Sequence, residues 1–186
     1  MAAFVYTDPE TGRQTDITAQ PKYGTILADV PWKTNQTGGR GASRHYPLMS
    51  LSAICALRVD QLAADDAHLW LWITNSNFFE AMDVMEAWDF RYKSCLTWIK
   101  PYFRLGSYLR NQTEHLLLGV RGHAPIQFRG QGTWFYAPVQ EHSHKPEEQY
   151  AIIERCSAGP YLELFARRRQ PGWDAWGNEV DCDVAL

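Results

Sequence analysis

The chain has 186 residues, of which 45% are hydrophobic and 13% aromatic, and a formal net charge of −3. This length suits one domain with a sizeable core, and the aromatic content excludes general disorder. We therefore expect one globular α/β domain at residues 23–180, between an N-terminal tail (1–22) and a C-terminal tail (181–186).

The N-terminal tail is charged and has no apolar core, which argues against a signal peptide or a membrane anchor. The four cysteines lie far apart and form no C-x-x-C pair. This spacing argues against a disulfide framework and against a zinc site. A cytoplasmic protein with reduced cysteines is expected.

The first apolar run, Thr25 to Ala28, ends abruptly at Asp29, Val30, Pro31 and Trp32. Such a run is typical of a buried parallel strand, and open α/β sheets bind ligands at the carboxyl ends of these strands. The sequence therefore predicts that the four residues line a crevice. The alternative is an ordinary strand end, in which Asp29 caps a turn and Trp32 packs in the core.

An Asp-x-Pro-aromatic loop suits methylation of the exocyclic amine of a nucleobase. The lone pair of this amine nitrogen is delocalised into the ring, which makes the amine a poor nucleophile. The Asp29 carboxylate and the Val30 carbonyl could accept the two amine hydrogens while Trp32 stacks on the base. D-V-P-W resembles the D-P-P-[WYF] motif of amino-group DNA and RNA methyltransferases, with Val30 replacing the first proline. Because the resemblance implies that this position acts through its backbone carbonyl, we expect a less rigid loop with its chemistry retained.

Residues 33–46 contain three glycines and no acid, a composition typical of a mobile loop that could close over a substrate. Arg40, Arg44 and Tyr46 in this loop are candidate substrate contacts.

The following patterns predict alternating helices and strands. A short capped helix is expected at 50–57, a buried strand at 68–74, and a helix at 77–88 whose apolar stripe is Phe78, Met82 and Met85, with Phe79 as an optional fourth. Strands follow at 91–99 and 114–120, with a break at residues 100–101. A helix opening at 143–148 and a strand at 161–166 complete a largely parallel, Rossmann-like sheet flanked by helices.

Charge is unevenly distributed along the chain. Residues 60–89 hold seven acidic side chains and no Lys or Arg, which suits a solvated face turned away from an anionic substrate. Residues 91–131 hold seven basic side chains and one acid, Glu114, interleaved with aromatic residues. This pattern favours a nucleic-acid groove. The alternative is a solvated surface with buried aromatic rings.

A second candidate site follows the strand at 161–166, where Arg167 to Arg169 precede a polar loop from Pro171 to Glu179. There is no G-x-G-x-x-G and no phosphate loop, so neither a dinucleotide nor a nucleoside triphosphate is indicated. A nucleoside without phosphates, such as S-adenosyl-L-methionine (SAM), fits better. Its ribose, carboxylate and ammonium groups call for the charged and amide side chains found here.

Four segments of this half occur in a recognisable order: S-H-K-P-E-E at 143–148, I-I-E-R-C-S-x-G at 152–159, E-L-F-A-R at 163–167 and G-W-D-A-W-G-N-E at 172–179. Together with D-V-P-W they are similar to the MT-A70 family. That family contains the catalytic subunit of the eukaryotic mRNA adenine N(6)-methyltransferase and small bacterial and phage relatives. The resemblance spans about Tyr23 to Val180, and the chain looks like one of the small relatives.

The resemblance implies a SAM-dependent, metal-independent adenine methyltransferase in which the catalytic loop precedes the cofactor loop. It implies a SAM pocket that contains Asp29, Lys145, Glu163, Arg167, Asn178 and Glu179. Lys145 would meet the SAM carboxylate, while Arg167 and Asn178 would reach the ribose. Two readings without a cofactor stay open: Glu163 could pair with Arg167 across a surface, and Trp176 could be core.

The acceptor cleft is implied to contain Trp98, Lys100, Asn111 and Glu114, and Arg110 lies beside them in the basic run. His142 and His144 lack a third ligand spaced to complete a metal site. We favour DNA over RNA as substrate because the small single-domain form looks like family members that modify DNA. RNA methylation and a catalytically silent nucleic-acid-binding partner subunit are the alternatives. A monomer or a homodimer is expected.

Overall fold

The computed structural model describes residues 5–7, 14–16, 21–33, 48–104, 106, 108–140 and 144–186. Near the N-terminus, β1 (Val5–Thr7) and β2 (Gln14–Asp16) pair as a short antiparallel ribbon, where the sequence predicted only a tail. Among the described residues, no helix combines the length and the apolar character needed to cross a membrane.

A seven-stranded sheet in the order β7-β5-β6-β4-β3-β8-β9 forms the centre of the protein. Its strands are β3 (Tyr23–Ala28), β4 (Ala63–Ile73), β5 (Arg91–Arg104), β6 (Asn111–Arg121), β7 (Trp134–Tyr136), β8 (Tyr161–Leu164) and β9 (Trp173–Trp176). Only β6 runs antiparallel to its neighbours, and every other pairing in this sheet is parallel. The predicted mostly parallel, Rossmann-like α/β fold is confirmed.

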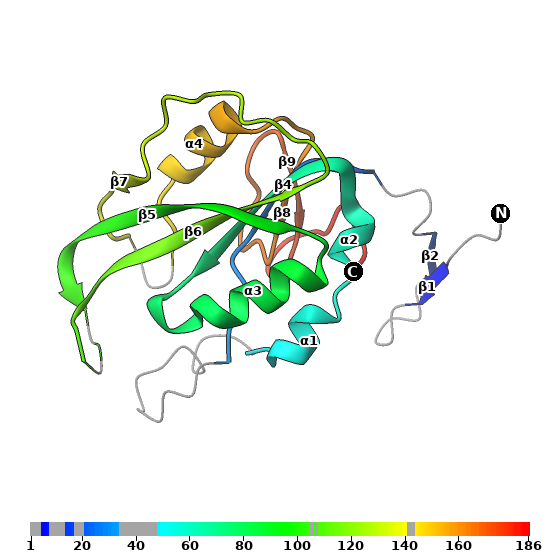
Figure 1. Cartoon of the computed structure of the whole chain (residues 1–186). Coiled ribbons are helices and arrows are strands. Elements are labelled where there is room, and N and C mark those ends of the chain that lie inside the picture. Colours follow the sequence, from blue (N-terminus) through cyan, green and yellow to red (C-terminus); the bar gives the residue numbers. More distant parts are fainter. Residues whose placement is uncertain are drawn as a thin grey trace.

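Helices cover both faces of the sheet (Figure 1). They are α1 (Leu51–Cys55), α2 (Val59–Leu62), the 3-10 turn η3 (Asn75–Asn77), α3 (Phe78–Ala87) and α4 (Glu148–Cys156). We call the side that includes Leu27, Trp72 and Leu116 the α4 face, because these residues form one buried cluster with α4. The opposite side, which includes Ile26 and Leu117, packs against α1, α2 and α3 and is the α3 face. Alternation along each strand therefore decides which layer a side chain enters.

The short helix α1 begins where the sequence predicted a cap. Ser50 is extended, and its hydroxyl accepts a hydrogen bond from the Ala53 backbone N–H. Such a cap satisfies one of the orphan donors of the first turn.

The apolar stripe predicted for α3 is wrong in part. Ala81, Val84 and Met85 are the buried residues of this helix, whereas Phe78 and Phe79 are 38% and 84% exposed. The prediction gave weight to the largest side chains, but Ala81, Val84 and Met85 recur at the three- and four-residue spacing of one helix face.

The break predicted at residues 100–101 is also wrong, because β5 continues through Pro101 to Arg104. The ladder to β6 is irregular there: its register shifts between Ile99 and Arg104. A proline is tolerated where the regular ladder is interrupted, since its missing N–H breaks no hydrogen bond.

Helix α4 starts at Glu148, the last residue of the opening predicted at 143–148, and Tyr150, Ile153 and Cys156 on it are buried. Strand β8 ends at Leu164, two residues earlier than predicted. The next residue, Phe165, has a φ of 62°. A left-handed backbone is rare for a bulky residue, and such residues concentrate at functional sites.

The C-terminal residues belong to the packed structure. Val184 is 8% exposed within the α3-face cluster, and Asp183 accepts a hydrogen bond from the Ala175 N–H at 2.8 Å.

Gly24 allows the closest approach between β3 and the segment that precedes β8. An added Cβ would lie 2.7 Å from the Gly159 carbonyl oxygen and 2.8 Å from that of Ala158. Both are backbone atoms, so Gly24→Ala is expected to lower the free energy of unfolding by roughly 1–3 kcal/mol. Urea denaturation measures this, with Gly132→Ala as the control because no heavy atom lies within 4 Å of its added Cβ. Equal stability of the two variants would contradict the prediction.

Candidate active site

Asp29 lies directly after β3, at the carboxyl edge of the sheet. β3 sits between β4 and β8, so the chain order reverses on its two sides. Open α/β sheets form their ligand crevice at such a switch point.

The Asp29 carboxylate is held by Lys145, which lies 116 residues further along the chain. Lys145 Nζ donates to Oδ1 at 2.8 Å and to Oδ2 at 2.7 Å. Burial raises the pKa of the Asp29 carboxyl, and the Lys145 ammonium opposes that rise. The pair therefore brings a carboxylate and an ammonium group together at the mouth of the crevice.

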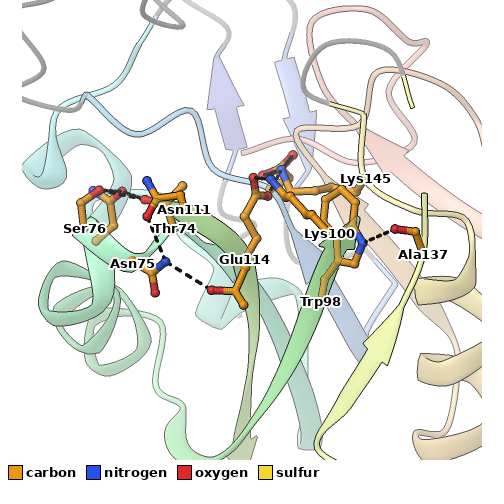
Figure 2. Close-up of polar contacts among 12 residues, drawn as sticks. Thr74, Asn75, Ser76, Trp98, Lys100, Asn111, Glu114, Ala137 and Lys145 are labelled. Carbon is orange, nitrogen blue, oxygen red and sulfur yellow. Dashed lines mark hydrogen bonds and ion pairs between the residues drawn. The ribbon is translucent and has the colours of Figure 1, made fainter. Parts of the chain in front are cut away.

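The charge arrangement continues from Lys145 to Glu114 and Lys100. Lys145 Nζ lies 3.6 Å from Glu114 Oε2, and Lys100 donates to Glu114 Oε1. Burial alone would raise the pKa of Glu114, but Lys145 and Lys100 together hold it below its ordinary value. Figure 2 shows the labelled Lys100, Glu114 and Lys145 gathered at the same end of the sheet. Carboxylates and ammonium groups thus alternate from Asp29 to Lys100.

The loop after Asp29 is fixed by backbone contacts. The Trp32 N–H donates to the Val30 carbonyl at 2.9 Å, and the Met49 N–H donates to the Pro31 carbonyl at 2.9 Å. The Trp32 indole donates to the Trp72 carbonyl at 3.2 Å, and its ring is partly buried against the α3-face core. Part of the alternative reading is therefore correct, since Trp32 does pack on the core. The Val30 carbonyl keeps a second lone pair for another donor.

A pocket of about 180 Å³ opens next to the Asp29–Lys145 pair. The predicted residues that line it are Asp29, Lys145, Glu163, Arg167 and Glu179. It is also lined by Trp72, His144, Gln149, Tyr150, Phe165 and Arg168, for which the sequence predicted no contact with a cofactor. Asn178 is exposed beside Glu179. Of the predicted loop residues, Asp29 alone lines this pocket, and Asn178 is not among its lining residues.

Tyr150 is the most informative of the residues that sequence reasoning missed. It is buried on the apolar face of α4, but its hydroxyl donates to Glu163 Oε2 at 2.9 Å. A tyrosine among apolar helix positions is the available signal, because a buried phenol normally needs a polar partner.

Arg167 and Arg168 pair with carboxylates other than Glu163. Arg167 Nε lies 3.0 Å from Glu179 Oε1, and Arg168 pairs with Glu147. The proposed Glu163–Arg167 surface pair is therefore replaced by the Tyr150–Glu163 contact.

Glu163 titrates near neutral pH. Burial raises its pKa from 4.5 to about 7, although the Tyr150 hydroxyl stabilises the charged form. The folded state thus binds a proton more readily than the unfolded chain between these values, so the free energy of unfolding falls as the pH rises from about 4.5 to 7. Glu163→Gln stays neutral and is expected to be the more stable protein at pH 8 by on the order of 2 kcal/mol.

Urea unfolding at pH 5 and pH 8 tests this expectation. Glu148→Gln, a change at an exposed glutamate of α4, is the matched control and should keep the wild-type pH dependence. If Glu163→Gln shows the same pH dependence as wild type, the burial of this charge is not what destabilises the protein.

The residues predicted for the acceptor cleft do not all lie together in the structure. Trp98 is 2% exposed and its indole donates to the Ala137 carbonyl, so the expected direct contact with substrate is corrected: Trp98 supports Lys100, whose Nζ lies 4.7 Å from the ring centroid. Asn111 lies on the α3 face, opposite to Glu114, and accepts a hydrogen bond from Asn75 Nδ2. Arg110 is exposed at the end of the β5–β6 hairpin and donates to the Gly106 carbonyl. Arg40, Arg44 and Tyr46 lie outside the described residues.

The residues of the pocket fit the polar groups of SAM. The Asp29–Lys145 pair offers opposite charges to the ammonium and carboxylate of an amino acid. Arg167 and Glu179 offer hydrogen-bonding groups for a ribose, and Phe165 and Trp72 supply apolar surface. Within the described part of the chain, no group of three or more His, Cys, Asp and Glu residues could hold a metal ion.

Comparison with known proteins identifies the family of the chain. The MT-A70 family profile matches residues 23–179. The chain is 30% identical over 185 residues to the type II methyltransferase M.MunI of Mycoplasma sp, covering 86% of this chain and 78% of that protein. It is 33% identical over 181 residues to the N(6)-adenosine-methyltransferase MT-A70-like protein of Drosophila melanogaster, covering 91% of this chain and 29% of the relative.

It is also 30% identical over 183 residues to the human N(6)-adenosine-methyltransferase catalytic subunit METTL3, covering 91% of this chain and 30% of the relative. The chain thus spans under a third of these two eukaryotic relatives and most of M.MunI. The family match takes in both the Asp29 loop and the pocket residues up to Glu179. The chain belongs to the MT-A70 family.

Proposed function

We propose that this protein transfers a methyl group from SAM to the N(6) amine of adenine in DNA. The observation that carries the proposal is the Asp29–Lys145 pair at the carboxyl edge of β3, where the loop for an amine and the pocket for a nucleoside meet. SAM supplies the electrophilic methyl group on its sulfonium.

In this proposal Asp29 and the Val30 carbonyl accept hydrogen bonds from the adenine amine and aim its nitrogen at the methyl group. Each carboxylate oxygen has more than one lone-pair site, so Asp29 can accept from the amine as well as from Lys145. Catalysis then rests on positioning and on acceptance of the amine hydrogens. Trp32, held by the Trp72 carbonyl, offers a ring face for the base.

On the cofactor side, Lys145 pairs with the SAM carboxylate, and Asp29 lies near its ammonium. Arg167 and Asn178 are proposed to reach the ribose, with Glu163 and Glu179 in the same pocket. Lys145 carries three donors, which serve Asp29 and Glu114, so pairing with the SAM carboxylate would exchange one of these contacts.

The similarity to M.MunI supports DNA as the substrate, since the chain covers 78% of that type II methyltransferase. RNA is the competing substrate, favoured by the similarity to human METTL3. A base in a duplex must also be flipped out of the stack before Asp29 can reach it.

The decisive experiment supplies labelled SAM with matched duplex DNA, single-stranded DNA and RNA, followed by digestion to nucleosides. We expect label in N(6)-methyldeoxyadenosine. Label only in N(6)-methyladenosine would reassign the substrate to RNA, and label in methylcytosine would overturn the choice of base. No label from any pool, together with no thermal shift by SAM, would instead support a catalytically silent partner subunit.

A further inference from the structure

Two large rings stand exposed on β7, the edge strand of the sheet. Trp134 and Tyr136 are 60% and 59% exposed, whereas Phe135 between them packs against the α4-face core. β7 pairs in parallel with β5 so that Trp134 is opposite Thr97 and Tyr136 opposite Ile99. Both rings therefore project from the α3 face, and we call these two residues the aromatic ridge.

The spacing of the ridge selects between kinds of nucleic acid. Residues two apart on one face of a strand are separated by about 6.6 Å. This is roughly twice the 3.4 Å rise per nucleotide along one strand of B-form DNA. Two rings at that spacing match neighbouring bases only if the bases are unstacked and the strand is extended. Aromatic side chains on a sheet surface stack unpaired bases in this way.

The charge around β7 suits a phosphate backbone. From residue 91 to residue 140 the sequence carries seven Lys or Arg residues and one acid, Glu114. Glu114 is paired with Lys100 and Lys145, which neutralise its charge, so it does not repel an anion. Lys93 and Arg104, both exposed, lie on β5, the strand that pairs with β7.

The ridge lies one strand away from Lys100 of the candidate active site, on the opposite face of the sheet. Tyr136 is registered with Ile99, and the next residue on β5 is Lys100. Lys100 contacts Glu114, Glu114 contacts Lys145, and Lys145 holds Asp29. Lys100 stands over Trp98 on the α4 face, so a strand whose target base enters the Asp29 loop reaches the ridge by passing around the edge strand β7.

We propose that Trp134 and Tyr136 stack on two unpaired nucleotides that flank the target adenine. The proposal rests on the proposed function in one respect, that the substrate is a nucleic acid. It adds that the bound segment is single-stranded and that β7 is part of the binding surface.

Fluorescence anisotropy with a labelled oligothymidylate that contains one central adenine tests the ridge, in DNA and RNA forms and as the matching duplex. Trp134→Ala and Tyr136→Ala are each expected to weaken single-strand binding by roughly 5- to 150-fold, and to weaken duplex binding much less. Trp134→Phe should restore most of the affinity because it keeps a ring. Phe79→Ala removes a comparably exposed ring on α3 and should leave binding unchanged.

Three outcomes would overturn the proposal. The double variant could bind the single strand as tightly as wild type, or it could lose equal affinity for single strand and duplex. It could also convert a dimer into a monomer in sedimentation without a change in oligonucleotide affinity, which would assign the ridge to a second copy of the chain. Binding is measured without turnover. A wild-type protein that binds the single strand but transfers no methyl group would therefore refute the proposed function without contradicting the proposed role of the ridge.

Discussion

Asp29→Ala is expected to reduce methyl transfer to adenine by roughly 10³- to 10⁴-fold while leaving the protein folded. The change removes an acceptor for the amine hydrogens, and the Val30 carbonyl alone cannot orient both. Folding should survive because the Asp29 side chain is 34% exposed and Lys145 keeps Glu114 within 3.6 Å.

Incorporation of tritiated methyl groups measures the effect, and a thermal melt checks the fold. Asp83→Ala is the matched control, since it removes an exposed aspartate on α3. Asp29→Asn keeps one acceptor oxygen but adds a donor, so intermediate activity is expected. Near wild-type transfer by Asp29→Ala would rule out the proposed mechanism.

Lys145→Met is expected to weaken SAM binding by about 30- to 4,000-fold, equivalent to roughly 2–5 kcal/mol for a charged group left without its partner. The substitution keeps an unbranched side chain that can still pack near Trp72, whose ring centroid lies 5.4 Å from Lys145 Nζ. It removes the one ammonium group that contacts both Asp29 and Glu114 in the described structure.

Calorimetric titration with SAM provides the measurement. Lys145→Arg keeps the charge and should bind more tightly than Lys145→Met, while Lys93→Met alters an exposed lysine of β5 and should bind like wild type. Because Lys100 still neutralises Glu114 in Lys145→Met, the variant should remain folded. An unchanged dissociation constant would remove Lys145 from the cofactor pocket.

The parts of the fold that the sequence predicted correctly are those with local causes. The apolar run of β3 ends at Asp29, and Ser50 provides the predicted cap of α1. The course of β5 through Pro101 could not be predicted locally, because the proline is tolerated only where the ladder to β6 shifts register. The exposure of Phe79 could not be predicted from its size, because the phase of α3 decides which residues face the sheet.

The site shows the same division between local and distant causes. The Asp29 loop and the pocket residues near Glu163 could be predicted from their motifs. The ion pair between Asp29 and Lys145 could not, since it depends on the docking of segments 116 residues apart. Asn111 and Glu114 lie on opposite faces of the sheet because side chains alternate along β6. Predicting which face each one takes requires the register of β6, which no motif provides.

The position of β3 between β4 and β8 makes the active site a late product of folding. β4 precedes β8 in the chain, so one edge of β3 can pair before Tyr161–Leu164 have been synthesised and the other cannot. Until then β3 is an open edge whose unpaired backbone groups lie beside Ile26 and Leu27, a surface prone to aggregation. A nascent chain would therefore expose an aggregation-prone strand edge at the position where the folded protein has its binding pocket. A chaperone that covers this edge would protect the chain during folding.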